Sequence, residues 1–507
     1  MRTKTNRRAG GVAPGEGKAP SPLRSAGALH KAMGDSSPME CGGNDAALAG
    51  HVLASASAEP PSPEAAERGW QQQTLGQMVD AGIVWAKNGY ADGGYNESGV
   101  GIPHLRPFNV SDNGDISLSQ IKSVEPPPPE SPHRLRRLDV MFNNTNSEEL
   151  VGKTALFDSE GAFVLSNHMT ILRVLRGQEL DPAWLARALH LKWLCGESQA
   201  MCRRHVNQAS ISLDRLRGVE LLLPPLPEQR AIAGVLRTVQ GTKEACERVL
   251  AATRQLKQSL LHHFFTYGPV PFPQAAHVPL KETEVGPMPV HWSMVSMGDI
   301  ETFMQYGTSS RCESGGSGLP VLRIPNVVGG RIDTADLKYL AASPTEIERH
   351  LLQRGDLLFV RTNGVRENVG RCAVYLGSPA RSLFASYLIR ARLAPDRALP
   401  EFVQLFTETS TGRASFTGRA SGAADGKFNI NTQTIRSTIL PLPPLPEQRE
   451  IAAQLSALDA KLAAEESRRA ALAALFQSLL HHLMTGRVRV PLDCGGKRSA
   501  TPLSPST

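Results

Sequence analysis

A polar segment in the second half of this 507-residue chain carries residue types that proteins use to recognise nucleic acid. The side chains of Arg, Asn, Asp and Glu can hydrogen-bond the edges of bases, whereas Lys and Arg reach phosphates and set affinity. The candidate contacts in this segment are Arg361, Thr362, Asn363, Arg366, Glu367 and Asn368. Because strand-like runs lie on both sides, we expect these residues to form a polar loop between two strands.

The first half holds a less well matched polar segment, FNNTNSEELVG at 142–152, and both halves contain a later basic region. In the first half the candidate contacts are Asn143, Asn144, Asn146 and Lys153, followed by Lys192, Arg203, Arg204 and His205. The later basic region of the second half offers Arg413, Arg419 and Lys427. The alternative is that these are ordinary solvated surface residues, and the sequence alone leaves both interpretations open.

The sequence lacks motifs that would indicate catalysis by this chain. It contains no GxxxxGK[ST] phosphate-binding loop and no Asn/Asp-Pro-Pro-aromatic run of the kind that amino-methyltransferases use. The glycine-rich run SGGSG at 314–318 is typical of a flexible loop. The pairs His262-His263 and His481-His482 recur in both halves, but neighbours on a helix point about 100° apart and do not converge on one metal ion. We therefore predict no catalytic residue, no metal site and no cofactor bound by this chain.

Composition indicates the kind of partner and the compartment. The formal net charge of +7 and the pI of about 9.1 favour a polyanionic partner. The seven cysteines form no CxxC motif, which argues against a disulfide framework or a zinc site and fits a reducing cytosol. No apolar stretch approaches the roughly 20 residues that a membrane span requires. We expect a cytoplasmic protein with no membrane partner.

An internal repeat organises the chain. The octapeptide LPPLPEQR occurs at 223–230 and again at 442–449, an offset of 219 residues. Looser matches keep their order: IPHLRPFNV (102–110) with LPVLRIPNV (319–327), RRLDVMFNNTN (136–146) with QRGDLLFVRTN (353–363), SNHMTILRV (166–174) with ASYLIRARL (385–393), and NQASISLDRLRGVELLLP (207–224) with NINTQTIRSTILPLP (429–443). The two halves should therefore share one layout.

A long helix is predicted after each copy of the octapeptide. Apolar residues recur there at steps of three and four, which is the pattern of a coiled-coil seam. The residues predicted to pack in the seam are Ile232, Leu236, Val239, Leu260, Ile451, Leu455, Leu458, Leu462 and Leu479, with Leu250, Leu256 and Phe264 continuing the first copy. Gly268 and Gly486 lie just past the helices, where a left-handed cap favours glycine. Each helix would run for about 39 residues, or roughly 58 Å, and its simplest partner is the other copy, packed antiparallel.

These elements predict an α+β fold in which two similar mixed α/β globular domains are separated by two long antiparallel coiled-coil helices. The predicted parts are a disordered extension at 1–69, a first domain at 70–222, a first spacer helix at 223–267, a linker at 268–290, a second domain at 291–441, a second spacer helix at 442–486 and a flexible tail at 487–507. The extension is rich in Ala, Gly, Pro and Ser and has no sustained apolar period, so it cannot bury a core.

The repeated motif resembles a known family. P-L-P-x-Q-R-x-I occurs at Pro225–Ile232 and Pro444–Ile451, and GDLLFVRT and ASYLIR lie upstream of the second copy. These segments look like those of specificity subunits of type I restriction–modification systems, over about residues 70–486 in both halves. The long N-terminal extension and the weaker match of the first domain depart from that family's pattern.

The resemblance implies a division of labour. Each globular domain would be a target recognition domain that reads one part of a bipartite double-stranded DNA site. The helices would fix the gap and dock two modification subunits, which methylate adenines with S-adenosylmethionine. Restriction subunits, which use ATP and Mg²⁺, would join that core and cut the DNA. The chain itself would be a non-catalytic subunit of the methyltransferase and deoxyribonuclease complex.

Several alternatives stay open. The chain could serve another multi-subunit methyltransferase or restriction system, or be an architectural binding protein without restriction activity; a fused restriction–methylation enzyme is disfavoured because its motifs are missing. The repeated pairs Gln229-Arg230 and Gln448-Arg449 either brace the helix start against the globular domain or contact a modification subunit. Bracing is the interpretation that we favour.

Overall fold

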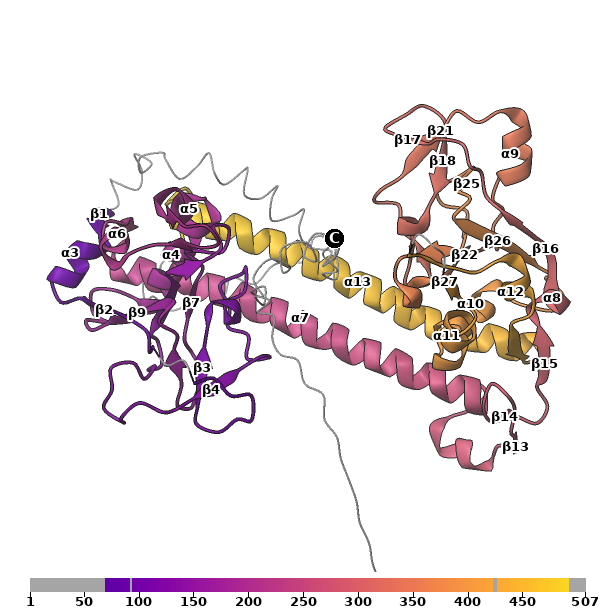
Figure 1. Cartoon of the computed structure of the whole chain (residues 1–507), viewed down its shortest axis with the longest axis horizontal. Coiled ribbons are helices and arrows are strands. Elements are labelled where there is room, and N and C mark those ends of the chain that lie inside the picture. Colours follow the sequence, from indigo (N-terminus) through magenta and orange to yellow (C-terminus); the bar gives the residue numbers. More distant parts are fainter. Residues whose placement is uncertain (1–68, 92–93, 423–425, 492–507) are drawn as a thin grey trace, which may run out of the picture. The chain divides into compact units, whose positions relative to one another are not determined.

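The computed structural model describes residues 69–91, 94–422 and 426–491 (Figure 1). The chain divides into a first unit, which ends at Arg230 and includes Met484–Arg489, and a second unit, which holds Ala231–Leu483 and the residues from Val490. The predicted N-terminal extension and most of the predicted C-terminal tail lie outside the described residues. No helix in the described part of the chain has the length and apolar character needed to cross a bilayer.

The first unit is built on a four-stranded antiparallel sheet. Its order is β2 (Val84–Asn88), β9 (Met169–Val174), β5 (Val140–Asn143) and β7 (Thr154–Leu156). All four residues of β5 are buried, and α4 (Pro182–Leu194) packs against β5 and β7. The start of this helix is capped: the Asp181 carboxylate accepts a hydrogen bond from Trp184 N at 2.9 Å, and Pro182 takes the first helical position.

Smaller sheets and short helices complete the first unit. They are the sheet β4 (Lys122–Val124), β3 (Ile102–Leu105) and β8 (Val164–Leu165), the sheet β10 (Arg203–Arg204), β11 (Ala209–Ser210) and β6 (Thr145–Asn146), the pair β1 (Gln71–Thr74) and β12 (Glu220–Leu223), and the helices α3 (Leu75–Asp80), α5 (Glu197–Met201) and α6 (Leu213–Arg217).

The globular domain of the second unit repeats this topology. Its four-stranded sheet has the order β16 (Glu301–Tyr306), β26 (Leu388–Leu393), β22 (Leu357–Val360) and β24 (Cys372–Val374). The smaller sheets are β17 (Glu313–Ser314), β21 (Lys338–Leu340), β18 (Leu319–Leu322) and β25 (Leu383–Phe384); then β27 (Ser421–Gly422), β28 (Phe428–Asn429) and β23 (Thr362–Asn363); and the pairs β15 (Ser293–Ser296) with β29 (Ile439–Leu442), β13 (Leu280–Lys281) with β14 (Met288–Pro289), and β19 (Val327–Val328) with β20 (Arg331–Ile332).

The helices of this domain are α8 (Met297–Ile300), α9 (Pro344–His350), α10 (Pro400–Glu408), α11 (Ser410–Thr417) and α12 (Thr432–Arg436). The strand order β16-β26-β22-β24 matches β2-β9-β5-β7, and β27-β28-β23 matches β10-β11-β6. The internal repeat of the sequence is therefore a repeat of topology, and the predicted α+β class is confirmed.

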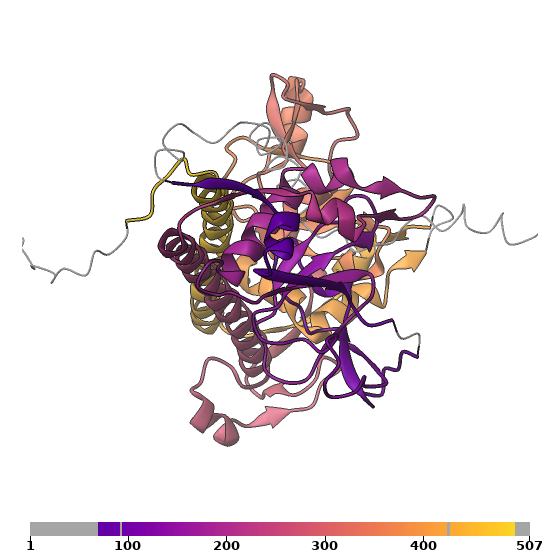
Figure 2. The same cartoon turned by 90° about the vertical axis from the view of Figure 1, so that its left-hand side faces the viewer.

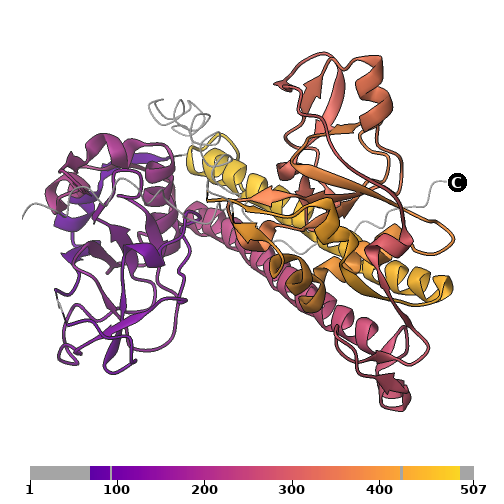
Figure 3. The same ribbon diagram turned by 45° about the vertical axis from the view of Figure 1, so that its right-hand side comes forward.

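Two long helices pair within the second unit. They are α7 (Leu226–Tyr267) and α13 (Leu445–Met484), of 42 and 40 residues, and they lie side by side in Figures 1 and 2. Leu261 and Phe264 of α7 share a core with Ile451 of α13, whereas Cys246 earlier in α7 packs with the later Leu462. The helices are therefore antiparallel, as predicted. Figure 3 shows the orange globular domain alongside them.

The ends of the helices differ slightly from the prediction. The helix α7 begins three residues after the predicted 223, because Leu223 is the last residue of β12, and α13 likewise follows β29. Gly268 has a φ of 80° and Gly486 a φ of 72°, so both glycines take the left-handed conformation expected past a helix end.

The predicted seam residues differ in burial along the helix pair. Ile232, Leu236, Ile451, Leu455 and Leu462 are buried, whereas Val239, Leu260, Leu458 and Leu479 are partly buried. Leu256 is 46% exposed and Lys257 takes the inward position. The ammonium of Lys257 lies 2.7 Å from Asp459 of α13 and 2.6 Å from Glu408 of α10. A buried cation with two carboxylate partners therefore replaces an apolar contact at this level.

The paired histidines differ in burial. His263 is buried and His262 exposed, and in the second copy His481 is buried and His482 partly exposed. Within the described ranges no group of three potential metal ligands gathers.

Candidate nucleic-acid interface

Each globular domain carries a small three-stranded sheet that joins its two candidate segments. Hairpin sheet 1 consists of 145–146, 203–204 and 209–210, and hairpin sheet 2 of 362–363, 421–422 and 428–429. Asn146 pairs with Ala209, which pairs with Arg204; Asn363 pairs with Phe428, which pairs with Gly422. Side chains separated by about 60 residues in the sequence thus lie in one cross-strand row.

Hairpin sheet 1 presents a basic turn. Arg203, Arg204 and the connecting residues 205–208 are exposed, and Val206 is completely so. The Arg204 guanidinium pairs with Glu148, and His205 Nε2 contacts Ser210 Oγ at 3.0 Å. These contacts orient the turn while leaving it open to a partner.

Hairpin sheet 2 continues into a short polar turn. The side-chain Oδ1 of Asn363 accepts hydrogen bonds from Val365 N at 2.9 Å and from Asn368 Nδ2 at 3.4 Å. Val365 and Arg366 are exposed, and Lys427, which directly precedes β28, is exposed as well. The structure therefore brings together part of the predicted segment 361–368 and the separately predicted Lys427.

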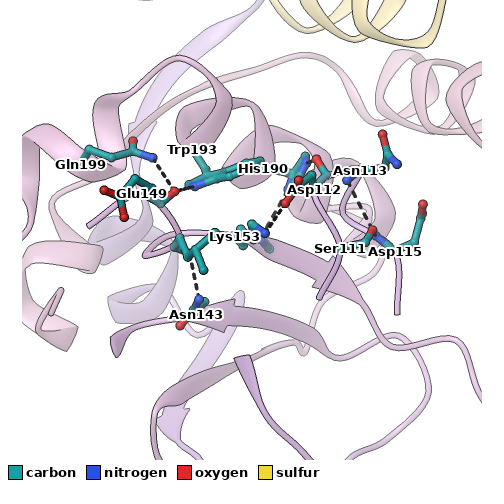
Figure 4. Close-up of polar contacts among 12 residues, drawn as sticks. Ser111, Asp112, Asn113, Asp115, Asn143, Glu149, Lys153, His190, Trp193 and Gln199 are labelled. Atoms are coloured by element: carbon teal, nitrogen blue, oxygen red, sulfur yellow. Dashed lines mark hydrogen bonds and ion pairs between the residues drawn. The ribbon is translucent and has the colours of Figure 1, made fainter. Parts of the chain in front are cut away.

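Three candidates of the first domain are buried instead of forming an exposed loop, and Figure 4 shows the contacts of two of them, Asn143 and Lys153. Asn143 Nδ2 donates to Leu150 O at 2.8 Å, and Asn144 Nδ2 donates to Thr170 Oγ1 at 3.0 Å. The Lys153 ammonium pairs with Asp112 and lies 5.1 Å from the centre of the Trp193 ring. The expectation of a polar surface loop is therefore corrected for Asn143, Asn144 and Lys153. Asn146 is partly buried at the edge of hairpin sheet 1.

Other basic candidates form hydrogen bonds within their own domain. Arg413 Nη2 donates to Glu367 O at 2.8 Å and to Val369 O at 2.7 Å, and burial lowers the pKa of its guanidinium. Arg366 Nε donates to Thr417 O at 2.9 Å, and Arg419 Nη1 to Ser437 O at 2.8 Å. Lys192 forms an ion pair of 2.7 Å with Glu197. Arg413 and Lys192 are thereby placed as supports, whereas Arg366 and Arg419 remain exposed.

Comparison with known proteins shows what the chain is similar to. Residues 109–251 and 380–474 match the family model described as the type I restriction modification DNA specificity domain. One matched stretch lies in each half of the chain, so the chain is similar to this family in both halves.

Named relatives agree with that assignment. The type I restriction enzyme EcoKI specificity subunit of Escherichia coli (strain K12) is 32% identical over 247 residues, which are 47% of this chain and 50% of that protein. The chain thus spans half the length of this relative. The putative type I restriction enzyme MjaX specificity subunit of Methanocaldococcus jannaschii is 24% identical over 401 residues, 78% of this chain and 89% of the relative.

A solved structure shows the same fold. The S subunit of a type I restriction-modification system from M. genitalium matches with a TM-score of 0.53 at 15% identity, over 82% of this chain and 96% of that one. The sequence-based resemblance to type I specificity subunits is therefore confirmed.

The repeated octapeptide has a structural role in this protein. Gln229 Oε1 accepts from Asp181 N at 2.8 Å, and its Nε2 donates to Pro224 O at 2.9 Å. Gln448 repeats this pattern: Oε1 accepts from Leu399 N at 2.7 Å, and Nε2 donates to Pro443 O at 2.8 Å. The two buried glutamines join the start of each helix to the adjacent domain. These contacts explain how the glutamines brace the helix starts. Arg449, the neighbour of Gln448, is exposed.

Two further repeated contacts were not assigned a role from the sequence. Trp70 Nε1 donates to Glu228 at 2.9 Å, and Trp292 Nε1 donates to Glu447 at 2.9 Å. Asp139 forms a bidentate pair with Arg173, and Asp356 forms one with Arg392, at 2.6 to 2.9 Å. Both acids lie in the aligned segments RRLD and QRGD, so the repeat itself contained the signal for these supports.

A buried histidine contacts the loop at Asp112 (Figure 4). His190 Nε2 contacts Asp112 O at 3.0 Å, and its Nδ1 accepts from Thr154 N at 3.5 Å. This pattern fits the neutral imidazole, with the proton on Nε2. Burial, together with the charges of Arg187 and Lys153, lowers the pKa of His190 to about 3. The folded protein therefore holds this side chain neutral.

We predict that acid destabilises the first unit through His190. The unfolded chain takes up a proton below about pH 6.5, whereas the folded chain does not until about pH 3. Stability is therefore highest above pH 6.5 and falls between these values, by up to about 1.4 kcal/mol per pH unit. Thermal unfolding of His190→Gln between pH 7 and pH 5 should show a smaller pH dependence than the wild type. A matched His277→Gln change at an exposed site should leave the slope unaltered; equal slopes for all three proteins would contradict the prediction.

Proposed function

We propose that this chain is the DNA-recognition subunit of a type I restriction–modification complex, and that each globular domain reads one part of a bipartite site through its hairpin sheet. The proposal rests on one observation: the two hairpin sheets share one dipeptide at the same place but differ in the residues of another strand. Thr145-Asn146 and Thr362-Asn363 are the same dipeptide at the same place in the two sheets. The strand that carries Arg203-Arg204 in one sheet carries Ser421-Gly422 in the other.

Two domains that recognise different DNA sequences must differ in the side chains that contact the bases. A guanidinium can donate two hydrogen bonds to the edge of guanine, and an asparagine amide can pair with the edge of adenine. Lys and Arg beside these groups bind phosphates in a way that weakens with salt. Identical supports with different exposed side chains therefore allow one topology to recognise two different half-sites.

The chemistry is assigned to partner subunits under this proposal. Two modification subunits bind S-adenosylmethionine and methylate adenines, and restriction subunits bind ATP and Mg²⁺ and cut the DNA. Our chain selects the site for both reactions in the cytoplasm. The proposal is supported by the family match and by the names of the relatives, which are specificity subunits of type I restriction enzymes.

The test is selective loss of one half-site. The complex of this chain with its modification subunit is used with S-adenosylmethionine, and methylation-aware sequencing gives the bipartite motif. Replacing Arg203 and Arg204 together with alanine should weaken recognition of one half-site by about 10-fold or more, since a base contact contributes roughly 1–3 kcal/mol. The other half-site should be unchanged.

Controls separate recognition from folding. Arg137→Ala removes an exposed arginine of the same unit that pairs with Asp158 outside the hairpin sheet, and should methylate normally. The purified chain without partners should transfer no methyl group. Equal weakening at both half-sites in a folded double variant would count against separate reading, and methylation by the chain alone would refute the non-catalytic role.

A further inference from the structure

The two domains differ at the residue where the hairpin sheet joins the four-stranded sheet. Asn144 N donates to His168 O at 3.0 Å, and Asn144 O accepts from Ile211 N at 2.8 Å. In the second domain Arg361 N donates to Tyr387 O at 3.0 Å, and Arg361 O accepts from Ile430 N at 2.9 Å. The backbone contacts match one for one, so Asn144 and Arg361 occupy equivalent positions.

A neighbouring position differs in the same way. Asn88, the last residue of β2, pairs with Thr170, and Tyr306, the last residue of β16, pairs with Ile389. In the first domain these polar side chains satisfy one another, because Asn144 Nδ2 donates to Asn88 Oδ1 at 3.2 Å and to Thr170 Oγ1 at 3.0 Å. The result is a hydrogen-bonded network in which Asn144 and Thr170 are buried, with Asn88 exposed at its edge.

The second domain has an open arrangement there. The Arg361 guanidinium lies 4.7 Å from the centre of the Tyr306 ring. Tyr306 is 36% exposed, and Tyr387, whose carbonyl binds Arg361 N, is 58% exposed. An aromatic ring and a guanidinium with exposed tyrosines around them form a surface typical of interfaces.

Arg361 forms fewer and longer hydrogen bonds within its domain than Arg413, which stabilises the fold. Within the described residues its guanidinium has one long hydrogen bond, from Nη1 to Ser386 O at 3.4 Å, and its buried Nε has no acceptor. Arg413, by contrast, donates to two carbonyls at 2.7 and 2.8 Å. Stacking on a ring fixes the plane of a guanidinium and leaves its in-plane N–H groups available.

We infer that Arg361, stacked on Tyr306 and flanked by Tyr387, is a DNA-contacting specificity determinant of the second domain that the first domain lacks. This inference rests on the proposed function. It assigns DNA contact in the second domain to one group of side chains, Arg361, Tyr306 and Tyr387, which we call the platform. The ligand is a pair of acceptor atoms on DNA that a planar guanidinium can bind in bidentate fashion. Guanine O6 and N7 offer such a pair, and so do two phosphate oxygens.

The experiment uses the complete complex with the modification subunit. Its probe is a duplex carrying the bipartite motif found by methylation-aware sequencing of the host genome. Arg361→Gln should weaken binding and methylation at one half-site by about 10-fold or more. Arg361→Lys should lose nearly as much, because lysine keeps the charge but lacks the planar fork. Tyr306→Leu should give a smaller loss at the same half-site.

Modified DNA identifies the source of the acceptor pair. Replacing guanines of that half-site with 7-deazaguanine removes N7, and replacing single phosphates with methylphosphonate removes charge. One of these changes should weaken the wild-type complex while leaving Arg361→Gln unaffected. Sensitivity to 7-deazaguanine assigns the platform to a base, and sensitivity to methylphosphonate assigns it to the backbone; either supports the platform.

A matched control lies at the other end of the same strand. Arg354 precedes β22, is exposed and donates to Leu376 O at 3.0 Å, and Arg354→Gln should bind DNA normally. If Arg361→Gln melts like the wild type and binds both half-sites with wild-type affinity, the platform is wrong although the proposed function stands. If the wild-type complex methylates no bipartite motif, the proposed function itself fails.

Discussion

Replacing Asp356 with alanine is expected to lower the free energy of unfolding of the second unit by about 3–5 kcal/mol. Asp356 is fully buried, and its carboxylate accepts from Arg392 Nε at 2.7 Å and Nη2 at 2.9 Å, with Arg390 at 3.8 Å. It also accepts from Gln353 N at 2.8 Å. Removing the acid leaves the buried Arg390 guanidinium without a carboxylate to balance its charge. Keeping that charge away from water is then unfavourable and destabilises the fold.

Calorimetry or denaturant unfolding of the full chain measures this loss. Asp336→Ala is the matched control in the same domain, because Asp336 pairs with Arg323 at 2.7 Å but is 66% exposed, and it should cost at most about 1 kcal/mol. Asp139→Ala in the first unit should act like Asp356→Ala, since Asp139 is buried and forms the same bidentate pair. Equal effects of the Asp356 and Asp336 changes would show that the buried pair is not a support.

The repeat made the topology predictable before any residue was placed. An octapeptide duplicated at one offset, with matching strand-like runs before it, required two copies of one layout, and the strand orders agree. The octapeptide itself was harder to interpret, because its glutamine binds Leu399 N and Pro443 O through hydrogen bonds that only the folded chain brings within reach.

The candidate contacts were only partly predictable, because burial depends on partners that are distant in sequence. Asn144 looks like a loop residue until β2 and β9 supply Asn88 and Thr170. Lys153 looks like a phosphate ligand until the loop at Asp112 comes next to it. Conversely, nothing in the sequence joins Tyr306 to Arg361, since 55 residues separate them and the stack exists only across the ends of two strands.

The second large effect is expected from a change in the length of the helix pair. The resemblance to type I specificity subunits implies that the helices fix the gap between half-sites, so we predict that their length sets that gap. Insertions near Thr266 or Gly268 would disturb the second domain, because Thr266 is buried and Gly268 has a φ of 80°, a conformation that other residues rarely adopt. The middle of the pair is a better place. Gly241 of α7 is exposed there, and so is Ala470 of α13.

Inserting four helix-favouring residues after Gly241 and four after Ala470 should lengthen the pair by about 6 Å. Because DNA rises about 3.4 Å per base pair, the gap in the recognised motif should grow by one or two base pairs, with both half-site sequences unchanged. A four-residue insertion turns a helix by about 40° beyond a full turn, a change that coiled coils accommodate as a local stutter. Methylation-aware sequencing of cells carrying the variant measures the new gap.

A single insertion is the informative control. Four residues after Gly241 alone would shift one helix against the other, and residues such as Leu236 would lose their places in the core. That variant should assemble poorly, because burying a leucine contributes roughly 1.5–3 kcal/mol and several would be displaced together. If the double insertion methylates efficiently and the gap stays the same, the length of the helices does not set the spacing, and their role is to hold the domains and to dock the modification subunits.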